Sequence, residues 1–362
     1  MRAGATGAHA RWMRRALALA ARGRGAVGTN ALVGAVVVRG GHVVGEGWHS
    51  RYGAPHAEPV ALAAARDRAR GATIYVTLEP CAHTGKTPPC TRAIIASGIR
   101  TVVVGARDPS WAGSGIAELR RAGIRVVEGV MEEAARKLNE AFMTAWKRRR
   151  PFVTLKLAVT LDGRIADAKG RSRWISSREA RAVTRRLRAE NDAVMVGAGT
   201  AIADDPGLRS PVAGRTPLRV VVDGMARCGP RLELLRDGGP SLFVVSRRAP
   251  AARVAALRRA GAEVVTVPPG PGGVDLRRAL GALYAYGVGT VLCEGGAGLA
   301  GSLLDAGLAD RTTFVVAPMV IGGSGARPAV AGRGRPLVRA LRLREVRVTR
   351  AGDDTLVSGR IC

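Results

Sequence analysis

The sequence predicts an α/β protein built from two consecutive domains. Apolar runs of strand length alternate with Ala-rich stretches of helical spacing through both halves of the chain. Three arginines at 148–150 followed by Pro151 interrupt this alternation, and a helix does not continue through such a segment. The 362 residues, 47% of them hydrophobic, are enough for two cores. We therefore expect one domain at residues 1–148 and a second at 149–362.

The first half is expected to form a three-layer α/β/α sandwich. Residues 1–10 are small and polar and are expected to be a ragged start, whereas Met13, Leu17 and Ala20 share one face of a first helix. The pattern then alternates between strands and helices, as in sandwiches whose sheet is covered on both faces. Strands are expected at 33–38, 43–48, 72–78, 101–105 and 125–127, and helices at 12–22, 57–69, 91–97, 116–122 and 132–147.

The second half shows the same alternation after the arginine run, which we interpret as a linker. The apolar run 152–159 opens the second domain as a strand. Further strands are expected at 193–197, 218–223, 241–246, 262–267, 290–294 and 312–317, and helices at 178–188, 251–260, 276–284 and 299–307.

The composition limits the functions that the chain can have. No apolar run approaches the roughly 18 residues of a membrane span, so no membrane partner is expected. The net charge of +29 comes from arginines spread along the chain, with 4% aromatic residues, and this argues against nucleic acid as a partner. The five cysteines follow no disulfide spacing, which indicates a cytoplasmic protein.

The richest motif runs from Pro55 to Cys90. His56 and Glu58 stand at the expected start of a helix, Cys81 follows a strand, and Cys90 comes nine residues later. His-x-Glu followed by Pro-Cys and a second Cys is the signature of zinc-dependent deaminases. One imidazole and two thiolates fill three positions of a tetrahedral zinc and leave the fourth for water. The alternative interpretation is two buried thiols that pack as small apolar groups.

Glu58 is expected to be the catalytic proton carrier of this zinc site. Zinc lowers the pKa of a bound water toward neutrality. Glu58 is two residues from His56 and is not needed as a ligand, so it can move the proton of that water. The predicted reaction is hydrolytic deamination of an amino-heterocycle.

The amino-acid sequences of several segments resemble those of one enzyme family. These segments are His49, Gly53 to Glu58, Thr77 to Cys90, Leu155 to Arg164, Ser172 to Ile175, Asp192 to Gly197 and Thr200 to Pro206. Together they are similar to the bifunctional riboflavin-biosynthesis deaminase/reductase family, from about residue 11 almost to the end of the chain. The insert between Cys81 and Cys90 is typical of this family among zinc deaminases.

The resemblance implies a fold, two reactions and two cofactors. The first domain is expected to be cytidine-deaminase-like and the second dihydrofolate-reductase-like. The first would use Zn²⁺ to deaminate the phosphorylated pyrimidine 2,5-diamino-6-ribosylamino-4(3H)-pyrimidinone 5′-phosphate. The second would use NADPH to reduce the ribosyl group to ribityl. The resemblance also implies a homo-oligomer.

Individual site residues are carried over where they match the family. In the deaminase, the expected substrate-binding residues are Asn30, His49 and Lys86. In the reductase, the residues expected near the cofactor are Ala158, Trp174, Thr200 and Asp204, and those expected near the substrate are Ser172, Arg188, Leu208 and Glu294.

Physical reasoning supports parts of this assignment. Lys156 stands mid-strand among apolar residues, where an unpaired ammonium is costly. We expect Lys156 and Asp204 to be catalytic, polarising or protonating the opened sugar imine as hydride arrives, although Asp204 before Asp205-Pro206 is also typical of a turn. Gly296 and Gly298 belong to a Gly-x-Gly-x-x-Gly segment after a strand, which can hold the cofactor diphosphate or simply form a tight turn.

Three positions depart from the family wording. Ala31 replaces the usual proline after Asn30, and Ser110 replaces an asparagine that is expected to touch the deaminase substrate. In the reductase, Pro211 replaces a usual arginine, and we expect Arg209 to reach the same phosphate.

Three alternatives stay open from the sequence. A paralogue that acts on a related pyrimidine is favoured by Ser110, and a nucleic-acid-binding deaminase is favoured by net charge alone. A scaffold without deaminase activity is opposed by intact His56, Glu58, Cys81 and Cys90.

Overall fold

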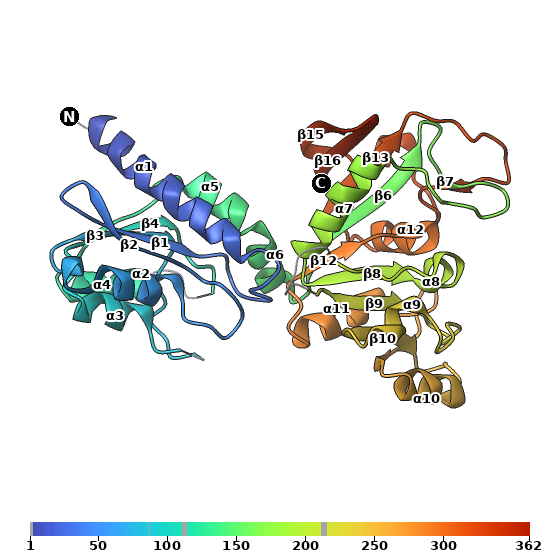
Figure 1. The fold of residues 1–362 in the computed structure, drawn as a ribbon, viewed down its shortest axis with the longest axis horizontal. Helices are drawn as coiled ribbons and strands as arrows, with labels where there is room; N and C mark the ends of the chain where they lie inside the picture. The colour runs from blue at the N-terminus through green and yellow to red at the C-terminus, as the bar shows by residue number, and fades with distance from the viewer. Residues whose placement is uncertain (1–2, 86, 111–113, 211–215) are drawn as a thin grey trace. The chain divides into compact units, whose positions relative to one another are not determined.

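The computed structural model describes residues 3–85, 87–110, 114–210 and 216–362, with side chains from residue 9 onward. The chain forms two compact units, Met1–Arg148 and Arg149–Cys362, each with its own sheet (Figure 1). Within the described ranges, no helix is long and apolar enough to cross a membrane.

The first unit has a five-stranded sheet in the order β2-β1-β3-β4-β5. β1 pairs antiparallel with β2 and β3, whereas β3, β4 and β5 run parallel. The strands are β1 (Gly34–Arg39), β2 (His42–Trp48), β3 (Thr73–Leu78), β4 (Thr101–Ala106) and β5 (Arg125–Val127). The helices are α1 (Ala3–Ala20), α2 (Ala57–Ala65), α3 (Cys90–Ala96), α4 (Ser114–Arg121), α5 (Glu132–Leu138) and α6 (Glu140–Arg148), with 3-10 turns at Ala21–Gly23 and Arg66–Ala69.

Helices cover both faces of this sheet because the strands are apolar on both sides. Val36 and Val38 of β1 pack in one cluster with Met13 of α1, whereas Val37 packs with Ala61 of α2. Figure 1 shows α1 and α5 over one face and α2, α3 and α4 over the other. The predicted three-layer α/β/α sandwich is confirmed.

Two helix predictions in the first unit need correction. α1 begins at Ala3, so most of the segment expected to be a ragged start is helical. The helix expected at 132–147 is two helices separated at Asn139, whose buried side chain accepts a hydrogen bond from the Leu32 amide (2.8 Å) and donates one to the Leu32 carbonyl (3.0 Å). The break therefore coincides with a polar contact to a distant segment.

The second unit has a nine-stranded sheet in the order β11-β10-β9-β8-β12-β6-β13-β16-β15. The first seven strands in this order are parallel, and β16 and β15 add an antiparallel edge. The strands are β6 (Phe152–Thr160), β8 (Ala193–Gly197), β9 (Leu218–Val222), β10 (Ser241–Ser246), β11 (Glu263–Val267), β12 (Thr290–Cys293), β13 (Arg311–Ala317), β15 (Leu343–Ala351) and β16 (Asp354–Ile361); β7 (Arg164–Ala166) and β14 (Arg327–Pro328) form a separate pair. The helices are α7 (Arg178–Ala189), α8 (Ala198–Asp204), α9 (Glu233–Arg236), α10 (Ala251–Arg259), α11 (Leu276–Ala285) and α12 (Ala297–Asp305), with a 3-10 turn at Leu337–Arg339.

The parallel part of this sheet determines where a ligand can bind. Leu155 of β6 packs with α11 and α12 on one face, whereas Val194 of β8 lies in the cluster that includes Ala201 of α8 on the other. The carboxyl ends of β8, β9 and β12 therefore open into loops at one edge, where open parallel sheets bind ligands. The predicted α/β architecture of this half is confirmed.

Three features of the second unit differ from the prediction. Arg150, expected in a linker, is 6% exposed and forms a bidentate pair with Asp310 at 2.6 and 2.8 Å, so the arginine run ends inside the core of this unit. Asp204 ends the helix α8 instead of beginning a turn. The hairpin β15/β16 was not predicted, because seven of the nine residues of β15 are exposed.

Candidate active sites

Three metal-ligating side chains meet at the ends of elements in the first unit. His56 caps the start of α2, Cys81 lies after β3, and Cys90 begins α3. His56 Nδ1 lies 3.6 Å from Cys81 Sγ and 3.3 Å from Cys90 Sγ, and the three potential ligand atoms lie within 4.8 Å of one another. A tetrahedral zinc with bonds of about 2.0–2.3 Å holds its ligand atoms roughly 3.5 Å apart. The donor set and its spacing therefore fit a zinc ion.

The start of α3 supports the charge of this cluster. Amides in the first turn of a helix have no partner within the helix, and the Cys90 amide donates to Cys81 Sγ at 3.4 Å. The pKa of Cys81 lies below its ordinary value, first because the Cys90 thiol donates a hydrogen bond to it and also because His56 does. The surroundings of Cys81 therefore favour the thiolate, which is the form that binds metals.

Glu58 lies two residues after His56, beside the same cluster, and has the properties of a proton carrier. It belongs to the first turn of α2 and is 3% exposed, and its Oε2 has no hydrogen-bond partner within the described ranges. Burial raises the pKa of Glu58 to about 7. A buried carboxyl group with a raised pKa beside this cluster is suited to both proton uptake and release.

Asn30 and His49, both predicted to bind substrate, contact each other beside the cluster. His49 Nδ1 lies 3.2 Å from the Pro55 carbonyl, which only accepts, so Nδ1 carries the proton and Nε2 accepts from the Asn30 amide at 3.1 Å. The ring of His49 lies 5.3 Å from the ring of His56. Burial lowers the pKa of His49, so the ring is neutral. This pair forms one fixed wall next to the candidate metal site.

Two other deaminase positions lie at the limits of the structure. Lys86 lies outside the described residues, as do Trp111 to Gly113. Ser110 is described, and both its amide (2.8 Å) and its hydroxyl donate to Asp108 Oδ1. The hydroxyl of Ser110 is thus directed into its own turn.

The sequence interpretation gave no role to Glu79, which the structure places at a helix start. Glu79 is 5% exposed, and its Oε1 accepts from the amides of Gly115 (3.1 Å) and Ile116 (3.2 Å) in the first turn of α4. A carboxylate at a helix N-terminus satisfies free amides and complements the helix dipole. In the sequence, its position directly before Pro80-Cys81 could have indicated a role. In the structure, Glu79 links this segment to α4, the helix that follows Ser110.

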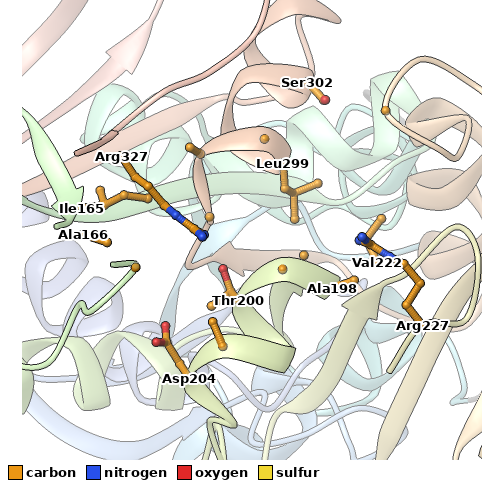
Figure 2. Close-up of a pocket in the computed structure, with 18 of the residues that line it drawn as sticks. Ile165, Ala166, Ala198, Thr200, Asp204, Val222, Arg227, Leu299, Ser302 and Arg327 are labelled. Carbon is orange, nitrogen blue, oxygen red and sulfur yellow. The ribbon is translucent and has the colours of Figure 1, made fainter. Parts of the chain in front are cut away.

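Two neighbouring cavities open at the carboxyl edge of the second sheet. The first, of about 370 Å³, lies between the loops after β8, β9 and β12, and Figure 2 shows its lining. The second, of about 450 Å³, lies against β6 and α7. Five residues line both cavities: Ile165, Ser172, Thr200, Asp204 and Gly296. Two ligands that react with each other can therefore meet at these five residues.

Asp204 stands at this junction. Its Oδ1 accepts from the Ser172 hydroxyl at 2.8 Å, and its carbonyl accepts from the Arg173 guanidinium. Figure 2 shows Asp204 and Thr200 on α8 at the edge of the first cavity. The carboxylate is thus held in place between the two cavities.

A largely buried network of three charged residues, Lys156, Arg188 and Glu294, lines the second cavity and does not line the first. Arg188 on α7 donates from Nε to Glu294 Oε1 (2.5 Å) and from Nη2 to Oε2 (2.8 Å). Lys156 is 8% exposed, and burial lowers its pKa while Glu294 acts in the opposite direction. Burial alone would raise the pKa of Glu294, but Arg188 and Lys156 lower it below its usual value. One carboxylate therefore serves two buried cations.

The other predicted reductase residues also line the cavities. Gly298 lines the first cavity with Gly296, at the start of α12. Ala158 and Trp174, expected near the cofactor, line the second cavity and do not line the first. Leu208 also lines the second cavity while it packs in the core at 2% exposure.

Arg209 does not point to either cavity. Its guanidinium pairs with Glu233 at 2.7 Å and Asp237 at 2.8 Å, and only its carbonyl contacts Arg188. Pro211 lies outside the described residues. The guanidinium of Arg209 is thus occupied by two carboxylates and does not line either cavity, in contrast to the expectation that it reaches a phosphate.

Two arginines that sequence reasoning missed line the first cavity. Arg227 follows β9, and Arg327 belongs to β14. In Figure 2 their guanidinium groups enter from opposite sides, Arg327 toward Thr200 and Arg227 beside Val222. No sequence signal could have identified them, because the chain has 57 basic residues.

Comparisons with known proteins agree with this division into two sites. Residues 6–106 match the cytidine and deoxycytidylate deaminase zinc-binding region, and residues 151–357 match the RibD C-terminal domain. The chain is 40% identical over 351 residues to the riboflavin biosynthesis protein RibD of Aquifex aeolicus strain VF5, covering 96% of each chain. It is 39% identical over 330 residues to that of Escherichia coli strain K12, covering 86% of this chain and 88% of the relative.

Solved structures give the same result. A diaminohydroxyphosphoribosylaminopyrimidine deaminase/5-amino-6-(5-phosphoribosylamino)uracil reductase from Thermotoga maritima matches with a TM-score of 0.86 and 35% identity, over 99% of this chain and 100% of that one. RibD from Acinetobacter baumannii matches with a TM-score of 0.88 and 34% identity, over 99% of this chain and 100% of that one.

Proposed function

Because the chain belongs to the RibD family of bifunctional riboflavin-biosynthesis deaminase/reductases, we propose that its first unit deaminates 2,5-diamino-6-ribosylamino-4(3H)-pyrimidinone 5′-phosphate and that its second unit then reduces the ribosyl group. The enzyme is a zinc hydrolase and an NADPH-dependent oxidoreductase. The observation that carries the proposal is the pair of sites described above: Glu58 at a His/Cys/Cys cluster, and Asp204 between two cavities.

In the deaminase, we assign the metal to His56, Cys81 and Cys90. When bound there, zinc supplies a water that is acidic enough to attack at neutral pH. Glu58 accepts the proton of the attacking water and delivers it to the ring nitrogen, and then assists the departure of ammonia. The neutral Asn30–His49 pair and Lys86 are assigned to substrate binding, the last of these from its position in the sequence alone.

In the reductase, the first cavity is assigned to the cofactor and the second to the substrate. NADPH supplies hydride when bound. Asp204, together with Lys156, polarises or protonates the opened sugar imine as hydride arrives, and Ser172 holds the Asp204 carboxylate in position by donating a hydrogen bond to it. Lys156 and Glu294 belong to the substrate cavity together with Arg188, whose guanidinium is occupied by Glu294. The cofactor residues are assigned as Thr200, Asp204, Gly296 and Gly298, together with Ala158 and Trp174, which line the second cavity. Leu208 is assigned to the substrate.

Product analysis by mass tests both assignments. The full chain is given the diamino pyrimidinone phosphate with and without NADPH. Without cofactor, we expect water to replace the amino group by oxygen with release of ammonia. With NADPH, we expect the product to gain two further hydrogens. Glu58→Gln should abolish only the first change and Asp204→Asn only the second, with pre-deaminated substrate supplied to the Glu58 variant. Normal NADPH oxidation by Asp204→Asn would overturn the role of Asp204.

A different substrate is the second candidate, and Ser110 favours it. The hydroxyl of Ser110 is held by Asp108, in a segment expected to touch the substrate. A paralogue would release ammonia from a related amino-pyrimidine but not from the diamino pyrimidinone phosphate, which the same mass analysis distinguishes.

Location and assembly are part of the same proposal. None of the five cysteines, all of which are described, forms a disulfide bond, and this supports a cytoplasmic protein. A homo-oligomer is proposed from the family alone. Cell fractionation and light scattering test these two points.

A further inference from the structure

The cofactor cavity has two ends that differ in chemistry. The junction residues Ser172, Thr200 and Asp204 mark the end where the cofactor must react, because only there does it meet the substrate cavity. The far end is lined by the last residue of β9 (Val222), by Arg227 in the loop after it, and by the segment that follows β11 up to the first residue of α11 (Pro271, Gly272, Val274 and Leu276). A dinucleotide whose nicotinamide lies at the junction therefore places its adenosine at the far end.

The middle of the cavity is formed by the start of α12. Gly296, Ala297, Gly298 and Leu299 line it, and helix N-termini bind diphosphates through free amides. A Cβ on Gly296 would lie 2.8 Å from Thr200 Oγ1, so glycine is needed for this close approach. The start of α12 is therefore the place in this lining that suits the diphosphate.

Among the described residues that line this cavity, only Arg227 and Arg327 are positively charged. Arg327 lies near the reactive end: its Nη2 is 3.3 Å from where a Cβ on Gly170 would be, and Gly170 and Ser172 belong to one loop. Figure 2 shows the Arg327 guanidinium pointing toward Thr200 and the Arg227 guanidinium beside Val222 and Ala198. Arg227 is therefore the cation of the adenosine end.

Arg227 forms an ion pair with a buried carboxylate. Asp223 is 0% exposed, its Oδ2 accepts from the Cys228 amide at 2.7 Å, and its Oδ1 lies 3.7 Å from Arg227 Nε. The Arg227 side chain is 59% exposed, so its other nitrogens remain accessible to a ligand. A guanidinium whose Nε faces a carboxylate presents its remaining donors as a planar fork, which matches a phosphate.

We propose that Arg227 binds the adenosine 2′-phosphate of NADPH and is the residue that makes this enzyme prefer NADPH to NADH. The proposal rests on the assignment of the first cavity to the cofactor. NADH differs from NADPH only in lacking this phosphate, so Arg227 contributes to the binding of one cofactor and not to that of the other. Arg327, at the reactive end, does not distinguish between them.

Direct titration of the full chain tests the proposal without turnover. NADPH and NADH binding is followed by nicotinamide fluorescence without substrate, and 2′,5′-ADP and 5′-AMP are used as competitors for the adenosine end. Arg227→Ala should raise the Kd of NADPH and of 2′,5′-ADP by about ten- to a hundredfold, the usual range for a lost hydrogen bond to a charged group. The Kd of NADH and of 5′-AMP should change by less than about twofold.

Matched variants separate this effect from general loss of charge or structure. Arg227→Lys should recover part of the NADPH affinity, and Arg258→Ala, which removes an exposed arginine of α10, should change neither Kd. Arg327→Ala should weaken NADPH and NADH by the same factor. Equal weakening of both cofactors by Arg227→Ala, or selective loss of NADPH in Arg327→Ala, would overturn the proposal. Wild-type protein that binds neither dinucleotide would overturn the reductase assignment itself.

Discussion

Arg188 and Glu294 face each other through two parallel hydrogen bonds at the wall of the second cavity of the reductase unit, with side-chain exposures of only 18% and 11%. The same carboxylate opposes the effect of burial on Lys156. The charges of Arg188 on α7 and Lys156 on β6 are therefore both compensated by Glu294, which directly follows β12.

Glu294→Ala should destabilise the second unit strongly. Removal of one partner of a buried ion pair leaves the other charge without compensation, at a cost of about 3–5 kcal/mol. In scanning calorimetry, the unfolding transition of this unit is identified as the one whose midpoint temperature rises when NADPH is added. In Glu294→Ala, this midpoint temperature should be lower than in the wild type. Glu233→Ala removes the more exposed partner of Arg209 and should cost about 1 kcal/mol or less. Equal shifts in the two variants would contradict the buried network.

Lys156 should give the reductase an alkaline limit below that of an ordinary lysine. Burial lowers the pKa of Lys156 from 10.5, and the protonated form is the one that can polarise the substrate. Activity should therefore be present below the lowered pKa and fall as pH rises through it. The measurement is kcat/KM against pH with pre-deaminated substrate. Lys156→Arg should move this decline to higher pH, and an unchanged profile would exclude Lys156 as its origin.

Cys90→Ser should remove zinc and deamination but leave reduction intact. The cluster supplies three ligand atoms within 4.8 Å, and loss of one thiolate removes a third of the protein ligands. Metal analysis should find about one zinc per wild-type chain and much less in the variant. Glu58→Gln should keep zinc and lose ammonia release, because Glu58 is not a ligand in this assignment. Cys362→Ser, at an exposed thiol, is the matched control; zinc retained in Cys90→Ser would contradict the ligand set.

The strands and helices that carry apolar runs could be predicted from the sequence, whereas exposed or small elements could not. β6 and β8 are buried on both faces and therefore read as continuous apolar segments. β15 has mostly exposed residues, including Arg344, Arg347 and Arg350, so no apolar run marks it. α8 is built largely of small residues and has no helical apolar stripe.

The two candidate sites differ in the same way. His56, Cys81 and Cys90 lie within 34 residues of one another in the sequence, each at the end of a strand or the start of a helix. Their spacing could therefore be recognised from the sequence. Pairing of Arg188 with Glu294, 106 residues apart, depends on the order of strands in the sheet, which the sequence pattern does not determine. The arginines of the cofactor cavity were hidden for a related reason, because nothing in their neighbourhood distinguishes them from the other basic residues.

Asn139→Ala should destabilise the first unit and weaken its deaminase site. The Asn139 side chain bonds to both the amide and the carbonyl of Leu32, and loss of the side chain leaves two half-buried polar groups without these partners, at a cost of about 2–3 kcal/mol. The calorimetric transition that does not respond to NADPH should fall in temperature. Because Leu32 is two residues from Asn30, the Asn30–His49 contact should also loosen and kcat/KM for ammonia release should fall. Asn139→Asp keeps the acceptor for the Leu32 amide and loses the donor, so it should give an intermediate effect. A stable, fully active Asn139→Ala would show that the break between α5 and α6 does not depend on this contact.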